Sequence, residues 1–200
     1  MPESVTRRRA PAGAAVMQPQ VTAAITEAAL AELAEVGYGK LSMEAIARRA
    51  AVSKPTLYRR WPTKERLVMA LITQVAVAAA EVPDTGDLRG DLIAFLDTNI
   101  RGLSHPQAAR IIPDLLAEAG RNPVLREALQ TDIGRTRRAK VVELLRRAID
   151  RGELPADLDI ELALDFLAAP TFWRSLTGGD ITEPGYLDRL VEMIIGALRA

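Results

Sequence analysis

Residues 42–61 constrain the fold more than any other stretch, because they encode two short helices separated by a tight break. Ser42 precedes an apolar stripe with helical spacing and is a suitable N-cap residue, and Ser53 holds the same position before the second helix. Pro55 lies in the first turn of the second helix, where a missing backbone N–H costs nothing. The pattern predicts a helix-turn-helix unit, followed at once by another helix.

The second short helix has few apolar residues. Only Leu57 and Trp61 are plainly apolar, and they are i, i+4 neighbours on one side. Because a helix of this length is stable only when it is packed, these two side chains must face its neighbours. The other side chains suit phosphates and base edges: Lys54, Thr56, Tyr58, Arg59 and Arg60. The alternative is a solvated basic face on an ordinary helical bundle, but the spacing favours a DNA-facing helix.

Three runs carry a family resemblance, LSMEAIA at 41–47, VSKPTLYRRW at 52–61 and KERL at 64–67. Together they resemble the DNA-binding domain of the TetR family of transcriptional regulators. The match covers about a quarter of the chain, and beyond it the length and the helix count agree. One residue departs from the family pattern, because the turn position usually filled by glycine is Ala51. If this position needs a positive φ, alanine costs roughly 1 kcal/mol there.

The charges are distributed unevenly along the chain, although the formal net charge is zero. Residues 1–66 hold 11 lysines and arginines against 6 acidic residues, a net charge of +5. Residues 67–200 hold 15 against 20, a net charge of −5. A basic N-terminal third on an acidic remainder is typical of a chain with one DNA-facing module.

The composition argues against several other classes of protein. The absence of cysteine excludes disulfides and thiolate metal sites, and the single histidine, His105, is expected at a surface or helix cap, so we expect neither metal nor cofactor. No apolar run reaches the ~18 residues of a membrane span, and the N-terminus is a poor signal peptide, which predicts a cytoplasmic protein. The sequence contains no recognisable nucleophile–base pair and no phosphate-binding glycine loop, so we do not expect an enzyme.

Helical periodicity continues after the motif, and no stretch alternates with period two for long enough to be a strand. We therefore expect an all-α fold without an internal repeat. Pro113 and Pro170 are expected to bend their helices. About nine helices are predicted, near residues 18–36, 43–50, 53–61, 63–81, 87–104, 106–119, 123–151, 160–177 and 182–200.

The helices divide into three predicted regions. Residues 1–17 are predicted to form a disordered basic arm. This arm is either a free tail or a segment that makes further contacts with DNA. Residues 18–81 form the helix-turn-helix DNA-binding domain with a long connecting fourth helix. Residues 82–200 form a second helical domain, and the boundary lies at the proline- and glycine-containing run 82–86.

The resemblance implies how the second domain is used. In TetR-like proteins the C-terminal helices bind ligand and dimerise, and the last two pair across a twofold axis as a four-helix bundle. Here these are the eighth and ninth predicted helices, which implies a homodimer through residues 160–177 and 182–200. Their periodicity permits this, although the same faces could close a monomeric bundle. Two recognition helices ~34 Å apart would read a palindromic double-stranded DNA operator.

The predicted DNA contacts centre on the second helix of the motif. Lys54, Pro55 and Thr56 stand at its start, nearest to base edges, and Arg59 one turn later can reach guanine. By resemblance, Tyr58 and Lys64 match family positions that hold phosphates. The full set is Ser42, Met43, Ser53, Lys54, Pro55, Thr56, Tyr58, Arg59, Arg60 and Lys64.

The effector site is predicted less specifically. A cavity among the fifth to eighth helices would be lined by Phe95, Ile111, Leu115, Phe166 and Trp173, each of which could also be an ordinary core residue. Their apolar character favours a small hydrophobic or amphipathic effector. We expect a dimeric repressor whose effector moves the fourth helix and changes the separation of the recognition helices. The alternatives are an activator, or a helical enzyme or small-molecule carrier with a vestigial helix-turn-helix.

Overall fold

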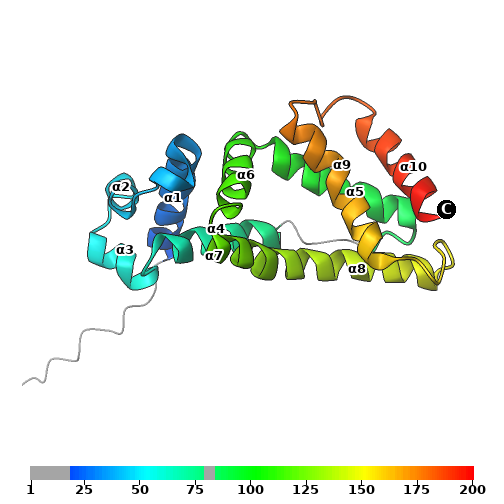
Figure 1. Cartoon of the computed structure of the whole chain (residues 1–200), viewed down its shortest axis with the longest axis horizontal. Helices are drawn as coiled ribbons and strands as arrows, with labels where there is room; N and C mark the ends of the chain where they lie inside the picture. Colours follow the sequence, from blue (N-terminus) through cyan, green and yellow to red (C-terminus); the bar gives the residue numbers. More distant parts are fainter. Residues whose placement is uncertain (1–18, 79–83) are drawn as a thin grey trace, which may run out of the picture.

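The computed structural model describes residues 19–78 and 84–200. These two ranges contain ten α-helices, one π-helical segment and no strand, which confirms the all-α fold. The molecule is elongated, with helices α1–α3 at one end and α9 and α10 at the other (Figure 1). The predicted basic arm and the first two residues of the predicted boundary at 82–86 lie outside the described residues.

The N-terminal end follows the sequence prediction closely. It comprises α1 (Pro19–Lys40), α2 (Met43–Arg49), α3 (Lys54–Arg60) and α4 (Lys64–Ala78). The first helix was expected to end near residue 36, and Gly37 directly after it is non-helical, with φ 75° and ψ 168°, although the range of α1 continues to Lys40. The predicted continuation of α4 to about residue 81 passes into residues that the structure does not describe.

The remaining helices are α5 (Leu88–Ser104), α6 (Pro106–Ala119), α7 (Pro123–Ala128), α8 (Arg135–Asp150), α9 (Ile160–Leu176) and α10 (Tyr186–Leu198). The helix predicted for 123–151 is interrupted by a π-helical segment, η1 (Leu129–Gly134). The last helix starts later than predicted, because Gly185 has a left-handed backbone with φ 76°. Pro113 was expected to bend or end its helix, and α6 does not end there but continues to Ala119.

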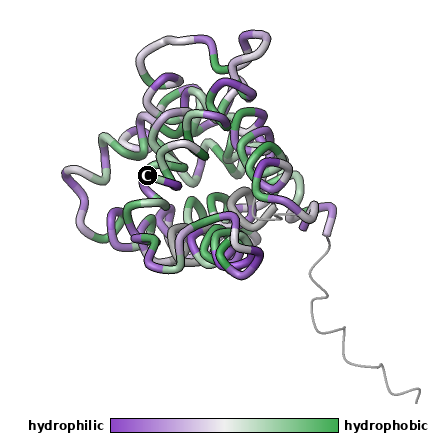
Figure 2. The backbone as a smooth tube through the Cα atoms, turned by 90° about the vertical axis from the view of Figure 1, so that its right-hand side faces the viewer, coloured by the Kyte–Doolittle hydropathy of each residue, from purple (hydrophilic) through white to green (hydrophobic). Residues whose placement is uncertain are grey.

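The buried apolar side chains form two separate cores. The first unites α1–α4 with four side chains from α6 and α7, namely Ile111, Leu115, Ala119 and Leu125. The second lies among α5, α8, α9 and α10. Hydrophobic and hydrophilic residues alternate along the helices in Figure 2, as expected where one face of each helix is buried. Helix α6 therefore packs on the DNA-binding end although it lies in the C-terminal part of the sequence.

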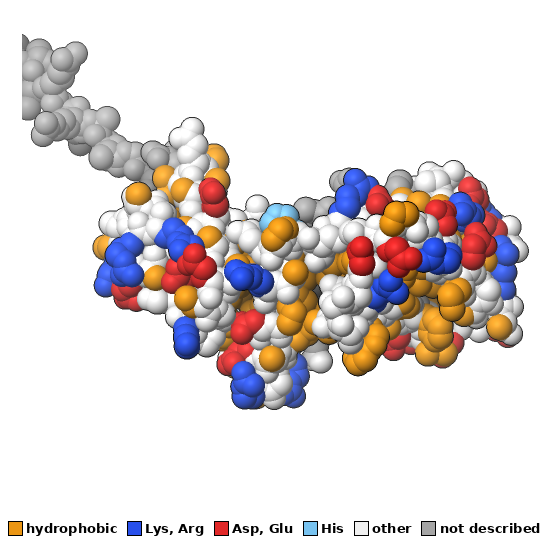
Figure 3. Space-filling model, turned by 90° about the horizontal axis from the view of Figure 1, so that it is seen from above, with side chains coloured by type: hydrophobic (Ala, Val, Ile, Leu, Met, Phe, Trp, Pro, Cys, Tyr) orange, Lys and Arg blue, Asp and Glu red, His pale blue; other side chains and the backbone are white. Residues whose placement is uncertain are grey.

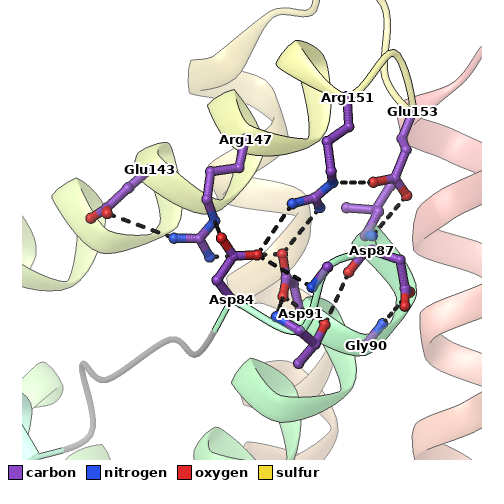
Figure 4. A network of polar contacts seen from close by, with 11 residues as sticks. Asp84, Asp87, Gly90, Asp91, Glu143, Arg147, Arg151 and Glu153 are labelled. Carbon is purple, nitrogen blue, oxygen red and sulfur yellow. Dashed lines mark hydrogen bonds and ion pairs between the residues drawn. The ribbon is translucent and has the colours of Figure 1, made fainter.

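A buried carboxylate joins the start of α5 to the end of α8 (Figure 4). Asp91 is completely buried, and its Oδ1 accepts hydrogen bonds from the backbone N–H and the hydroxyl of Thr85 at 2.7 and 2.8 Å. Its Oδ2 lies 3.2 Å from Arg151 Nη2 and 3.7 Å from Arg147 Nη2. Burial alone would raise the pKa of Asp91, but the bonds from Thr85 and Arg151 hold the pKa below its usual value.

Candidate nucleic-acid interface

The turn between α2 and α3 has the backbone geometry that its sequence position suggested. Ala51 has φ 52°, in the left-handed region that favours glycine. The turn is closed by hydrogen bonds from Ala51 N to Arg48 O at 3.2 Å and from Val52 N to Ala47 O at 3.0 Å. Alanine therefore occupies this strained position at a cost of about 1 kcal/mol without changing the motif.

Both predicted N-caps are present. Ser42 Oγ accepts the N–H of Ala45 at 3.4 Å, and Ser53 Oγ accepts the N–H of Thr56 at 3.3 Å. Leu57 is fully buried, and Trp61 packs half-buried against the same core. The prediction that these two residues anchor the short helix is confirmed.

The opposite face of α3 is open to solvent. The exposed residues are Ser53, Lys54, Pro55, Tyr58 and Arg59, and Thr56 is half-buried. Figure 3 shows lysine and arginine side chains gathered with a few acids at this end of the molecule. Hydroxyl, aromatic and cationic groups are thus presented together, with their apolar neighbours turned inward.

Two of the residues predicted to contact DNA, Met43 and Arg60, have side chains that are not on the exposed surface. Met43 is buried in the first core, so only its backbone, in the first turn of α2, remains available. Arg60 is half-buried, and its Nε and Nη1 atoms are enclosed without a hydrogen-bond partner among the described residues. Met43 belongs to the apolar stripe that follows Ser42, so its burial agrees with the helical spacing. The position of Arg60 was not predicted, because a seven-residue helix has too few residues to define its inward face sharply.

Lys64 is held by Tyr38, a residue outside the predicted set of DNA contacts. Lys64 Nζ donates to the backbone oxygen of Tyr38 at 3.1 Å and lies 4.6 Å from the centre of its ring. The Tyr38 hydroxyl donates to Glu65 Oε1 at 3.2 Å, and burial together with the negative charge of Glu65 raises the pKa of Tyr38 to about 12. The signal in the sequence was a bulky aromatic residue directly after a helix-ending glycine.

An acidic residue also lies on the exposed face. Glu44, in the first turn of α2, forms an ion pair with Lys54 at 3.4 Å and accepts a hydrogen bond from Ser42 at 3.2 Å. The pKa of Glu44 lies below its usual value because of a backbone hydrogen bond and the pairing with Lys54. This carboxylate competes with any external anion for the Lys54 ammonium group.

The five predicted effector-site residues do not line one cavity. Ile111 and Leu115 belong to the first core, and Phe95 belongs to the second. Phe166 and Trp173 point outward instead, and 68% of Trp173 is exposed. A small cavity of about 90 Å³ does lie among α5, α6 and α9, but its lining includes the neighbours Ile112 and Phe172. For Ile111 and Trp173 the prediction is wrong by one residue, which turns a side chain by about 100° around a helix.

A larger hollow lies on the outer face of α9 and α10. This groove, of about 710 Å³, is lined mainly by apolar side chains, among them Phe166, Trp173, Leu190, Met193 and Ile194. Met193 is 75% exposed, and hydrophobic side chains gather over this end of the molecule in Figure 3. Arg174 closes one side of the groove, bonded to Glu183 at 2.7 Å. Monomeric proteins rarely expose contiguous apolar patches of this kind unless the patch is used for binding.

The capped helix pair, the exposed polar face of α3 and the separate helical domain define a helix-turn-helix DNA-binding protein. The family model described as bacterial regulatory proteins, tetR family, matches residues 25–71. The model of the tetracyclin repressor-like C-terminal domain matches residues 82–194. The chain belongs to the TetR family of transcriptional regulators.

Individual relatives agree with this assignment. The chain is 32% identical to the DNA-binding transcriptional repressor TetR of Mycobacteroides abscessus, over 87% of this chain and 91% of that protein. Among solved structures, GusR of Salmonella enterica has 27% identity and a TM-score of 0.75, covering 91% of this chain and 96% of that one. The flavonoid-responsive regulator FrrA has 25% identity and a TM-score of 0.70, covering 90% of this chain and 96% of that one.

Within residues 19–78 and 84–200, no helix combines the length and apolarity needed to span a bilayer.

Proposed function

We propose that this regulator is a homodimeric repressor that binds a palindromic operator and is released by a small hydrophobic effector. The observation that carries the proposal is the exposed face of α3, which presents Lys54, Tyr58 and Arg59 outward while Leu57 is buried beneath them. The repressor role is supported by the relative from Mycobacteroides abscessus, which bears that name. Acting on genomic DNA places the protein in the cytoplasm and requires neither a cofactor nor catalysis.

The exposed residues divide into two roles at the DNA. Thr56 and Arg59 lie where a helix in the major groove meets base edges, so they select sequence. Tyr58 contacts a phosphate, Lys54 lies at the start of α3 near base edges, and Ser42 and Ser53 add hydroxyls at the two helix starts. Lys64 contributes its charge from the position at which Tyr38 holds it. Arg60 joins the phosphate contacts only after its side chain turns outward.

The groove on α9 and α10 is the proposed dimer interface. A second copy of the same two helices would cover the exposed apolar side chains of Trp173 and Met193 and remove them from water. An interface of this kind is symmetric, because each copy contributes the same patch. The two α3 helices then lie on one side of the dimer, separated by about one turn of DNA.

The proposed effector site lies among α5, α6 and α9. The cavity there is lined by Leu103, Ile112 and Phe172, and its 90 Å³ is well below the roughly 300 Å³ of an ordinary ligand pocket. An effector must therefore enlarge it, which moves α6 relative to α9 and favours a conformation with a different α3 separation. That FrrA is named for its response to flavonoids supports a small aromatic or amphipathic molecule.

The test is selection of bound fragments from the source genome with the full chain. The proposal predicts enrichment of a palindrome bound by two copies, and release of that fragment by at least one hydrophobic compound. Thermal unfolding of the free protein in the presence of the same compound measures binding separately. Enrichment of no common sequence, with all duplexes bound equally, would refute the proposal.

A further inference from the structure

One carboxylate connects the DNA-binding end to α6. Asp114 Oδ2 accepts the backbone N–H of Tyr38 at 2.7 Å, although the two residues are 76 positions apart. The N–H is available because Gly37, with φ 75° and ψ 168°, takes it out of the α1 hydrogen-bond ladder. A hydrogen bond to an ionised carboxylate is stronger than one between neutral groups. The end of α1 is therefore fixed directly to α6.

The Asp114 carboxylate lies directly against Gly37, where the residue has no side chain. A Cβ atom on Gly37 would lie 2.8 Å from Asp114 Oδ1 and 3.1 Å from its Cγ. The positive φ of Gly37 independently disfavours any larger residue. Both the backbone conformation and the close approach of Asp114 therefore require glycine here.

From Tyr38 the connection continues to the start of α4. The side chain of Tyr38 is almost fully buried, its hydroxyl donates to Glu65, and its backbone oxygen accepts Lys64 Nζ. Lys64 and Glu65 form the first turn of α4, which begins directly after α3 and its short turn. A single residue, Tyr38, thus lies between the α6 carboxylate and the segment that follows the recognition helix.

Helix α6 contacts both halves of the molecule. Its residues Ile111 and Leu115 are buried in the core of the DNA-binding end. Ile112 and Pro113, on another side of the same turns, line the small cavity against α5 and α9. Asp114 follows them directly, so it lies where the C-terminal helices meet the DNA-binding end.

We propose that Asp114 is a positioning residue for operator recognition: its bond to Tyr38 N–H sets the orientation of α3 relative to the dimerised C-terminal helices. The inference rests on the proposed function, because it needs two copies that read one palindrome. One base pair more between the half-sites displaces them by about 3.4 Å and rotates one against the other. A rigid dimer rejects such a site, whereas a dimer without the Asp114 bond can adjust to it. Binding to unrelated DNA does not depend on the separation.

The experiment compares the selected operator with versions that are one base pair longer or shorter. D114A is expected to reduce the preference for the correct spacing about ten-fold, the effect of roughly one charge-assisted hydrogen bond. D114N keeps a carbonyl oxygen that can accept the same N–H, so its preference for the correct spacing should fall by less than about three-fold. D97A is the matched control, because it removes a carboxylate that is paired with Arg101 of its own helix. All three should bind unrelated DNA as the parent protein does.

A second measurement reports the geometry without DNA. The chain has no cysteine, so R48C places a single spin label on the exposed surface of α2 in each copy. In D114A the distribution of distances between the two labels should broaden, and in D97A it should not. If D114A does not fold, D114L replaces it, because leucine is close to aspartate in length and has no oxygen to accept the Tyr38 N–H.

Two results would overturn the inference. One is a folded D114A that keeps the spacing preference of the parent protein, and the other is a loss of affinity that is equal for correct, altered and unrelated DNA. A parent protein that selects no palindrome contradicts the proposed function instead. The two failures are therefore distinguishable.

Discussion

The two outward faces of the molecule differ in kind. On α3 the apolar side chain of Leu57 is buried and polar groups such as Tyr58 and Arg59 face out. On α9 and α10 the outward side chains include Trp173 and Met193, both largely exposed. The first face suits a charged, hydrated partner and the second suits another protein surface. The difference supports the proposed division between one surface for DNA and another for a second copy of the chain.

The strongest test of this contrast places a charge on the apolar face. M193D should prevent dimer formation and reduce operator affinity by about 100- to 10,000-fold, because the two DNA-binding ends would no longer act together. Since Met193 is 75% exposed, the monomer should remain folded. Analytical ultracentrifugation and DNA titration measure the two effects. V124D, which alters another largely exposed apolar residue, on α7, should leave both unchanged.

The second test concerns the support beneath the polar face. L57A removes the fully buried side chain of α3 and should lower the free energy of unfolding by about 2–5 kcal/mol. Chemical denaturation followed by circular dichroism measures it. Y58A, the adjacent outward-facing change, should stay within about 0.5 kcal/mol of the parent protein. Equal losses for both variants would show that α3 is not oriented as described.

The third test concerns pH and the C-terminal half. Since the bonds from Thr85 and Arg151 lower the pKa of buried Asp91, its carboxylate favours the folded state above the unfolded pKa of about 3.8. This contribution is lost as the pH falls below that value towards the lower pKa of the folded protein. D91N should therefore be less stable at neutral pH and show a weaker dependence of stability on pH in this acidic range. A parallel pair of stability curves would contradict the assignment.

The smallest expected effect concerns the turn of the motif. A51G removes the strain of alanine at φ 52° and should raise stability by a few tenths to about 1 kcal/mol, with the entropy of glycine in the unfolded chain limiting the gain. Thermal unfolding measures the change. A50G, one residue earlier at φ −78°, is the control and should not stabilise the protein.

The sequence predicted the parts of the fold that depend on local signals. Ser42 and Ser53 marked helix starts, Gly37 marked the helix stop, and the unusual alanine at 51 pointed to a left-handed turn residue. These features are set by the backbone preferences of one or two residues.

Features that depend on tertiary packing were not accessible in the same way. The pairing of Tyr38 with Asp114 joins residues 76 positions apart, and no periodicity reports it. The cavity is lined by Phe172 instead of Trp173, because an error of one position turns a helical side chain to a different face. The π-helical segment η1 likewise gave no signal in the apolar pattern of residues 123–151.

Y58A and R59A test most directly whether the exposed side of α3 reads DNA. Both variants are titrated against the selected operator, against operators with single base changes, and against unrelated duplex. Y58A should bind all of them more weakly by a similar factor, as the loss of a phosphate contact requires. R59A should lose about 1–3 kcal/mol at one base pair and relax the preference there. Unchanged affinities in both variants would contradict the account.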